Sequence, residues 1–236
     1  RNRAAFHTDL YRPWLVGLDA SNAFACQAQG EAIHAGEKLR LEVRSNQITP
    51  LIGVFDMLSA SLAVQHYDGK FVSGFGFAAS YYGLPDIGFI AWPDMVNFVQ
   101  RLRVASPHQH LLVDIDDGYV DPEVACHVAK HLERIGASGV ILEDQKRPRR
   151  CGHVEGKQIL ALEEYLEKLN LVLETREDLL VVARTDATEE SDKLEDLGVN
   201  VAIYSTPCLF AAQTAIENAL LKLRAKRRPT TRGQGR

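Results

Sequence analysis

Short apolar runs alternate with amphipathic stretches along most of the chain, and this alternation most restricts the folds that it can adopt. The apolar runs are Pro50–Phe55, Lys70–Ser73, His110–Asp114, Gly139–Leu142, Leu179–Ala183 and Asn200–Tyr204. Runs of this length and content are typical of parallel strands covered on both faces. Stretches with helical periodicity lie between them, at Asp94–Val104, from Asp121 to near Gly136, at Ile159–Arg176 and at Leu209–Arg224. Strand and helix in series predict a parallel sheet with helical crossovers, either doubly wound or closed into a barrel.

Length and charge restrict the domain organisation and the partners. The 236 residues suffice for one α/β domain, which we expect over residues 36–225, with an N-terminal extension over 1–35 and a basic tail over 226–236. A net charge of −4 gives no electrostatic reason to expect nucleic acid or an anionic membrane surface. No apolar run approaches the roughly 18 residues of a membrane span. Four cysteines without a CxxC pair indicate a reducing, cytoplasmic location, with an organelle transit peptide as the alternative.

Carboxylates follow the strand that begins near His110. Asp114 and Asp116 are two residues apart, and side chains two apart in a strand face the same way, so both carboxylates are expected to point into one space. Such a pair repels itself unless a cation or a proton separates the charges, and Mg²⁺ prefers oxygen ligands of this kind. A pair of solvated loop acids is the alternative, because this pattern alone is weak.

Polar residues also follow the next two strands. Glu143 and Asp144 end one, and Arg184, Thr185 and Asp186 end the other. The carboxyl ends of parallel strands meet at one edge, where active sites of α/β proteins are built. Acids there could hold a cation, and Arg184 could clamp a substrate carboxylate through two hydrogen bonds.

A long polar loop, residues 145–157, separates these two strands and has the composition of a mobile lid. Within it, Cys151 is flanked by Arg149, Arg150 and His153, cations that favour a thiolate or stabilise the conjugate base of a proton donor. The alternative is a chance surface cysteine. Earlier in the chain, the glycines of Ser73-Gly74-Phe75-Gly76 would let backbone N–H groups approach an anion, although a plain turn is the simpler interpretation.

Taken in order, these motifs resemble those of the isocitrate lyase/phosphoenolpyruvate mutase superfamily. The matching segments are Gly53–Ala60, Ser73–Phe75, Gly83–Asp86, Asp114–Tyr119, Glu143–Gln145, Arg149–His153 and Ala183–Ala187. The resemblance implies a (β/α)8 barrel. It also implies a homotetramer in which a C-terminal helix, here Leu209–Arg224, packs on a neighbouring subunit.

The resemblance further implies roles for individual residues. Mg²⁺, with Mn²⁺ as the alternative, would be held by Asp114, Asp116 and Glu143. The substrate would be bound by a second group of residues: Ser73, Gly74, Phe75, Asp86, Gly152 and Arg184. Catalytic roles would fall to Cys151, Arg184, Glu143 and His153, with Cys151 as the general acid.

The loop sequence Arg149-Arg150-Cys151-Gly152-His153 favours the lyase branch of the superfamily. The substrate implied is a small 2-hydroxy di- or tricarboxylate, resembling 2-methylisocitrate or a 2-alkylmalate, which would be cleaved to an α-keto acid and a second carboxylic acid. The alternatives are a phosphonopyruvate-processing enzyme (a mutase or a P–C hydrolase), an oxaloacetate hydrolase or decarboxylase, and a catalytically silent ligand-binding protein.

The sequence departs from the family pattern in two places. Asp117 stands where Thr is usual, and Val120-Asp121 where Gly-Asn is usual, so an extra carboxylate is expected near the metal. After Asp192 the chain leads almost at once into the approach to the last barrel strand. By comparison with the family, two strands are missing, roughly 40–60 residues at about 30 per βα unit. Either these residues are left out of the sequence, or the deletion is real and favours a non-catalytic relative.

Overall fold

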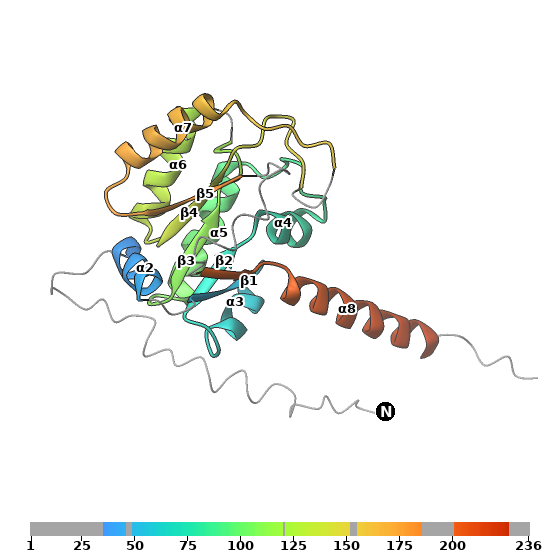
Figure 1. Cartoon of the computed structure of the whole chain (residues 1–236). Helices are drawn as coiled ribbons and strands as arrows, with labels where there is room; N and C mark the ends of the chain where they lie inside the picture. Colours follow the sequence, from blue (N-terminus) through green and yellow to red (C-terminus); the bar gives the residue numbers. More distant parts are fainter. Residues whose placement is uncertain (1–34, 46–48, 120, 152–154, 186–200, 227–236) are drawn as a thin grey trace, which may run out of the picture. The chain divides into compact units, whose positions relative to one another are not determined.

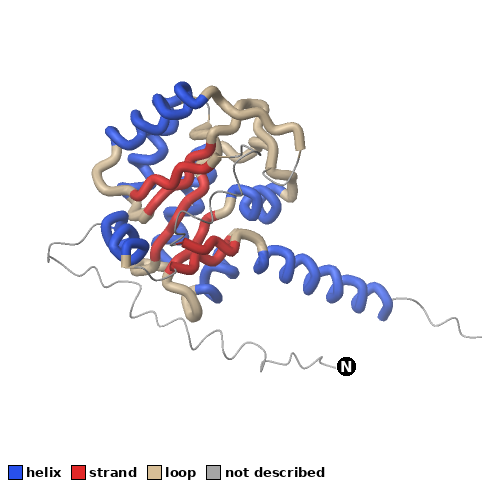
Figure 2. Tube along the Cα trace, in the orientation of Figure 1, coloured by secondary structure: helices blue, strands red, loops and turns tan. Residues whose placement is uncertain are grey.

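The computed structural model describes residues 35–45, 49–119, 121–151, 155–185 and 201–226. Its centre is a sheet of six parallel strands in the order β5-β4-β3-β2-β1-β6 (Figure 1, Figure 2). The strands are β1 (Thr49–Val54), β2 (Gly69–Val72), β3 (His110–Asp114), β4 (Gly139–Glu143), β5 (Leu180–Arg184) and β6 (Val201–Tyr204). Each of the six predicted strands is therefore confirmed, with ends that shift by one or two residues.

The helices are α2 (Ala35–Arg44), α3 (Met57–Ala63), α4 (Gly74–Phe77), the π-helix η3 (Ala78–Tyr82), α5 (Trp92–Ala105), α6 (Pro122–Arg134), α7 (Leu162–Thr175) and α8 (Pro207–Lys226). Helix α6 begins as predicted, because Asp121 Oδ1 accepts the N–H of Val124 at 2.9 Å and Pro122 occupies the first position. Helix α7 begins three residues later than predicted, because Ile159 forms an antiparallel bridge with Gln145 and so is held outside the helix.

Side chains of the strands alternate between two apolar clusters, as expected for a sheet that is covered on both faces. The larger cluster lies between the sheet and the helices and includes Val72, Val113 and Leu142. The smaller one, on the opposite face, contains Leu51, Phe71, Leu112 and Ile141, with Val182 packed against it. Both faces of the sheet are thus apolar in the middle except at Lys70 of β2, and the other buried polar side chains of the described strands lie at strand ends.

The order of the strands is that of an α/β barrel interrupted at one place. β6, the last strand in the sequence, pairs with β1, the first, as it does when strands are arranged in chain order around a barrel. β5 and β6 are neighbours in sequence but lie at opposite ends of the sheet, and residues 186–200 between them are outside the described residues. These 15 residues are too few for two βα units of about 30 residues each. The prediction of a barrel-type fold that lacks two strands is confirmed.

The 236-residue sequence runs from Asp192 to β6 without room for two further βα units, and whether residues are left out of it stays a prediction. The predicted extension over residues 1–35 and the tail over 226–236 lie, apart from Ala35 and Lys226, outside the described residues. Within the described ranges, no helix has the length and apolarity needed to cross a lipid bilayer.

One residue of the larger core is a lysine. Lys70 of β2 is fully buried, and its Nζ has no hydrogen-bond partner among the residues that the structure describes. Burial, assisted by the charge of Arg103, lowers the pKa of Lys70 from 10.5 to about 8, and Asp68 offsets only part of this effect. Because an unpaired buried ammonium group is costly, Lys70 destabilises the fold at neutral pH.

Replacement of this lysine by an apolar residue of similar size should stabilise the protein. We expect Lys70→Met to raise the free energy of unfolding at pH 7 by about 1–3 kcal/mol in urea denaturation. The folded-state pKa lies below the unfolded value, so the penalty of the wild type is present below pH 8 and is lost as the pH rises toward 10.5. The gain should therefore shrink above pH 8. Lys38→Met, on the exposed side of α2, is the control and should change stability by less than about 0.5 kcal/mol. A Lys70→Met variant less stable than the wild type at pH 7 would contradict this account.

Candidate active site

Two buried aspartates follow β3 and face the same space. The N–H of Asp116 donates to Asp114 Oδ1 at 3.1 Å. A Cβ placed on the neighbouring Gly74 would lie 3.1 Å from Asp116 Oδ1 and 3.7 Å from Asp114 Oδ2. The two carboxylates therefore converge as predicted, but the predicted reason is wrong. β3 ends at Asp114, and Asp116 adopts a φ of 54° in the turn that follows, a left-handed conformation that aspartate tolerates better than most residues.

The segment after β2 lies against these aspartates. Ser73 is buried and caps the short helix α4, with its Oγ accepting the N–H of Gly76 at 3.2 Å. A side chain on Gly74 would fit only if the Asp116 carboxylate moved slightly, because a Cβ there would lie 3.1 Å from Asp116 Oδ1. The ring of Phe75 lies 6.3 Å from that of Phe210 in α8. The predicted loop is thus a helix of four residues, and the hydroxyl of Ser73 serves as its cap.

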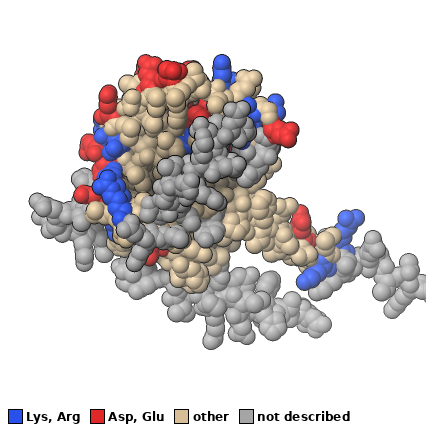
Figure 3. Space-filling model, viewed as in Figure 1, with Lys and Arg blue, Asp and Glu red and all other residues tan. Residues whose placement is uncertain are grey.

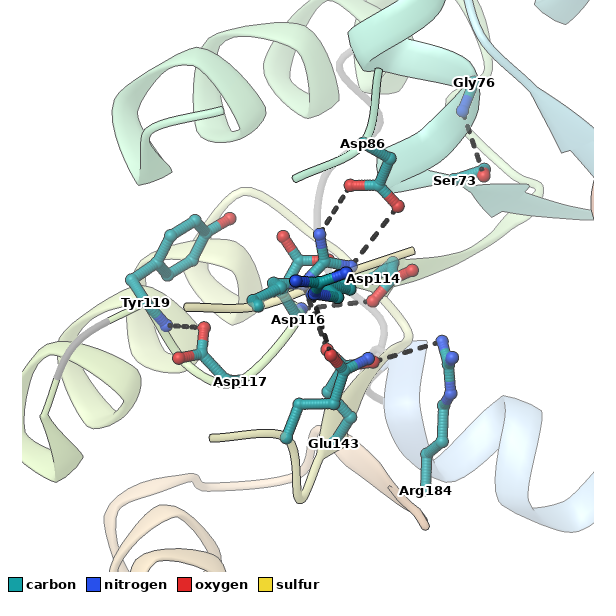
Figure 4. A network of polar contacts seen from close by, with 12 residues as sticks. Ser73, Gly76, Asp86, Asp114, Asp116, Asp117, Tyr119, Glu143 and Arg184 are labelled. Atoms are coloured by element: carbon teal, nitrogen blue, oxygen red, sulfur yellow. Dashed lines mark hydrogen bonds and ion pairs between the residues drawn. The ribbon is translucent and has the colours of Figure 1, made fainter. Parts of the chain in front are cut away.

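Glu143 and Arg184 occupy the last positions of β4 and β5 and are paired in register. Arg184 Nη1 lies 3.3 Å from Glu143 Oε2, and Glu143 is fully buried, whereas about a third of the Arg184 side chain is exposed. Figure 4 shows Asp86, Asp114, Asp116 and Glu143 turned toward one shared space, with Arg184 reaching Glu143 from the side. The structure therefore brings together Asp114, Asp116, Glu143 and Arg184, as the sequence predicts, whereas Asp186 lies outside the described residues.

Arg149, from the loop after β4, lies among these carboxylates and is itself only 4% exposed. Its Nε donates to Glu143 Oε1 at 3.0 Å, and its Nη1 donates to Asp86 Oδ1 at 2.5 Å. Its Nη2 forms an ion pair with Asp116 Oδ1 at 2.6 Å. The sequence placed Arg149 in the motif around Cys151, but its position in the carboxylate cluster was not predicted. The signal available in the sequence was that more acidic than basic side chains were predicted at this edge of the sheet.

Electrostatics explain why the cluster requires positive charge. Burial raises the pKa of Asp114, although Arg184, Arg149 and the N–H of Asp116 oppose the change. Burial and the neighbouring Asp114 raise the pKa of Asp116 well above its usual value, against the effect of Arg149. Burial alone would lower the pKa of Arg149, but the surrounding carboxylates, Asp116 foremost, outweigh it and raise that pKa. The site thus favours either protonated aspartates or an added cation.

The donor set of the cluster fits a divalent cation. Four carboxylates, on Asp86, Asp114, Asp116 and Glu143, outnumber the guanidinium groups of Arg149 and Arg184 by two, and carboxylate oxygens are the ligands that Mg²⁺ prefers. In the described part of the chain, however, no group of three or more His, Cys, Asp or Glu side chains is arranged to hold a metal ion. The Arg149 guanidinium lies between the carboxylates instead. The chemistry of the site therefore suits a metal, and its present arrangement would have to change to admit one.

Asp117, the residue that departs from the family pattern, has a different partner. Its carboxylate accepts two hydrogen bonds from Arg147, from Nε at 2.7 Å and from Nη2 at 2.8 Å, and it is buried. Lys168 of α7 donates to its carbonyl oxygen at 3.0 Å. The charge of Asp117 is therefore paired with Arg147, and this pair fixes the first part of the loop; the expectation that Asp117 lies near a metal stays a prediction.

Cys151 lies beside a cavity of about 320 Å³, whose lining is Ile87, Pro148, Arg149, Arg150 and Cys151. Its thiol is unpaired and partly buried. A cavity with two arginines and a thiol at its wall suits a small anion. Gly152 and His153, the other predicted residues of this loop, lie outside the described residues.

Comparisons with known proteins identify the family of the chain. The sequence profile of phosphoenolpyruvate phosphomutase matches residues 39–196. The chain is 32% identical over 167 residues to the chloroplastic carboxyvinyl-carboxyphosphonate phosphorylmutase of Arabidopsis thaliana. The aligned region covers 69% of this chain and 49% of that protein. It is 31% identical over 159 residues to 2-methylisocitrate lyase of Vibrio cholerae, covering 66% of this chain and 51% of the relative. The chain therefore spans about half the length of these relatives.

Solved structures show the same fold. A 2,3-dimethylmalate lyase, described as a PEP mutase/isocitrate lyase superfamily member, superposes with a TM-score of 0.76 at 21% identity, covering 86% of this chain and 89% of that one. A phosphonopyruvate hydrolase in complex with oxalate and Mg²⁺ superposes with a TM-score of 0.70 at 18% identity, covering 82% and 88%. At such identities the likeness concerns the fold, whereas the profile match extends over more than half of the sequence. The chain belongs to the phosphoenolpyruvate phosphomutase family.

Proposed function

We propose that this chain is a Mg²⁺-dependent carbon–carbon lyase. Its substrate would be a small 2-hydroxy di- or tricarboxylate, resembling 2-methylisocitrate or a 2-alkylmalate, and its products an α-keto acid and a second carboxylic acid. The observation that carries this proposal is the convergence of four buried carboxylates, two arginines and the Cys151 loop at the carboxyl edge of one parallel sheet. Active sites of α/β barrels are built at this edge.

Asp114, Asp116 and Glu143 would hold the metal, with Mn²⁺ as the alternative to Mg²⁺. Lewis-acid polarisation of a substrate oxygen is the chemistry that such an ion supplies. The excess of carboxylates over guanidinium groups in the cluster supports a divalent ion. The phosphonopyruvate hydrolase described with oxalate and Mg²⁺ supports the same choice of metal for this family.

The side chains of the loop and of β5 would carry out the cleavage. Arg184, exposed enough to be reached, would bind a substrate carboxylate, while Ser73, Gly74 and Phe75 would line the site beside it. A base would remove the proton of the 2-hydroxyl group, the C–C bond would break, and its electron pair would pass to the departing carbon. Cys151 would then transfer its thiol proton to that carbon. Gly152 and His153 adjoin Cys151 in the chain and complete the proposed loop.

Three other functions are alternatives to the lyase. A phosphonopyruvate-processing activity is supported by the matched family profile and by the chloroplastic phosphorylmutase. An oxaloacetate hydrolase or decarboxylase would use the same carboxylates and arginines. A catalytically silent ligand-binding protein is supported by the absence of two βα units, because the family's remaining strand-end residues would be lost with them.

The cysteines support a cytoplasmic location. Within the described ranges, Cys126, Cys151 and Cys208 are all free thiols. Free cysteines are typical of proteins in reducing compartments.

Release of keto acid from a panel of substrates tests the proposed activity. The panel comprises 2-methylisocitrate, isocitrate, 2,3-dimethylmalate, citramalate, oxaloacetate and phosphonopyruvate, each with Mg²⁺ or with EDTA. We expect release from a 2-hydroxy acid that requires Mg²⁺ and falls about 100-fold or more in Cys151→Ser, because a general acid typically contributes this factor.

Cys126→Ser is the matched control, since it makes the same chemical change at a partly buried cysteine of α6 and should retain activity. Turnover of phosphonopyruvate alone would overturn the lyase proposal in favour of P–C chemistry. The absence of turnover for every compound in the panel would favour the ligand-binding alternative.

We further propose that the protein forms a homo-oligomer, a tetramer by family resemblance, through α8. Five large apolar residues of this helix are at least half exposed, namely Phe210, Ile216, Leu220, Leu221 and Leu223. Much of the visible surface of α8 carries no charge, whereas acidic and basic side chains are interspersed on the rest of the described face (Figure 3). An apolar helix of this kind is costly in water and suits a subunit interface.

Light scattering after size-exclusion chromatography tests this interface. The wild type should elute with the mass of four chains of 26.2 kDa each. Leu220→Asp combined with Leu221→Asp should shift the mass to that of a smaller species, because a charge buried at an apolar contact is unfavourable. Asn218→Asp, on an exposed residue of the same helix, should leave the mass unchanged. A wild type that elutes as a single chain would contradict the proposal.

A further inference from the structure

Arg149 is the cation of the carboxylate cluster in this structure. Its guanidinium group contacts Asp86, Asp116 and Glu143, which come from three different parts of the chain, through all three of its nitrogens. The side chain is 2% exposed, so these contacts are made away from bulk water. Arginine is suited to this place because its planar fork of donors matches several carboxylates at once.

The carboxylates that Arg149 engages include two of the three proposed metal ligands, Asp116 and Glu143. A divalent ion takes oxygen ligands at roughly 2.0–2.1 Å if it is Mg²⁺, and it repels a neighbouring guanidinium group. The carboxylates of Asp116 and Glu143 already bind the Arg149 guanidinium, so a metal held by the same two carboxylates would place its charge next to that of Arg149. Occupancy by a metal and occupancy by Arg149 therefore compete for one site.

Arg149 is also joined to the proposed general acid by the chain itself, because Cys151 is two residues away. Before Arg149, the loop is fixed by the pair of hydrogen bonds from Arg147 to the buried Asp117. Asp117 is not among the carboxylates that Arg149 touches, so this anchor does not depend on the occupant of the cluster. Beyond it, the N–H of Arg150 donates to Gln145 Oε1 at 3.0 Å. Withdrawal of Arg149 would thus move the segment that carries Cys151 relative to a fixed anchor at Arg147.

We propose that Arg149 is a built-in counter-cation that a divalent metal displaces from the carboxylate cluster, so that the metal sets the position of the Cys151 loop. This inference rests on the metal site of the proposed function and adds a positioning residue to it. Arg149 offsets part of the negative charge of the cluster before the metal arrives, and its release couples metal binding to the arrangement of the proton donor.

Calorimetric titration with Mg²⁺, without substrate, tests the competition. Arg149→Gln should bind Mg²⁺ about tenfold or more tightly than the wild type, because the metal no longer has to displace a resident cation. Arg149→Lys keeps the charge but loses the planar set of N–H donors, so its affinity for Mg²⁺ should lie between those of the wild type and Arg149→Gln. Arg150→Gln is the matched control: it removes the same charge from the adjacent, exposed residue and should change the affinity less than about twofold. An equal gain in Arg149→Gln and Arg150→Gln, or no gain in Arg149→Gln, would overturn the proposal.

Alkylation of the wild-type protein tests the movement of the loop and does not depend on any variant. The rate of iodoacetamide labelling at Cys151, followed by peptide mass spectrometry, should change about fivefold or more when Mg²⁺ is added. Cys126 and Cys208 are internal controls whose rates should stay within about twofold. A Cys151 rate that is unaffected by saturating Mg²⁺ would overturn the inference. An enzyme that turns over substrate with Mg²⁺ but shows neither effect would retain the proposed function and lose this inference alone, so the two failures are distinguishable.

Discussion

The contact between one buried guanidinium group and a set of buried carboxylates is the interaction on which the candidate site depends. Four acidic side chains at the edge of a sheet would repel one another strongly in a water-poor environment, and carboxylates in such a place are tolerated only if a proton, a metal or a basic side chain compensates them. Arg149 supplies this compensation by reaching in from the loop after β4. Burial raises the pKa values of Asp114 and Asp116, and Arg149 opposes this rise at both; even so, the four carboxylates outnumber the guanidinium groups of Arg149 and Arg184 by two. The remaining negative charge is what makes the site suitable for a divalent ion.

The sheet determines where this charge can accumulate. Both faces of the strands are apolar, so the polar residues of β3, β4 and β5 are restricted to the strand ends, and the parallel arrangement puts their carboxyl ends at the same edge. The register between β4 and β5 then sets Glu143 beside Arg184. The left-handed turn after β3 adds Asp116 to the group. The absence of two βα units between β5 and β6 leaves this edge intact, because the acids and arginines described here all come from the first five strands and the loops that follow them.

Much of the fold could be predicted from sequence because its signals are local. Each of the six apolar runs became a strand, and the start of α6 followed from Asp121 and Pro122. The beginning of α7 could not be predicted in this way, since the bridge between Ile159 and Gln145 joins residues that no periodicity relates. Helix α3 was not predicted either. Asp56 and Ser59 form a reciprocal capping pair at its start, and this pair can be recognised in the sequence.

The site shows the same division between local and distant information. That Asp114, Glu143 and Arg184 would meet followed from their places after successive strands. That Asp116 would join them was predicted for the wrong reason, because alternation along a strand does not extend into a turn. The insertion of Arg149 and the pairing of Asp117 with Arg147 depend on how one loop folds over the sheet edge, and contacts across 33 and 30 residues respectively leave no pattern in the chain.

A crystal structure of the protein grown with Mn²⁺, with anomalous diffraction data collected at the manganese edge, tests the central claim most directly. The account predicts one anomalous peak within ligating distance of the carboxylates of Asp114, Asp116 and Glu143, with the Arg149 side chain withdrawn from between them. An unoccupied cluster at saturating Mn²⁺, with Arg149 still paired to Asp86, Asp116 and Glu143, would show that the arginine is the permanent cation of the site and would contradict the account.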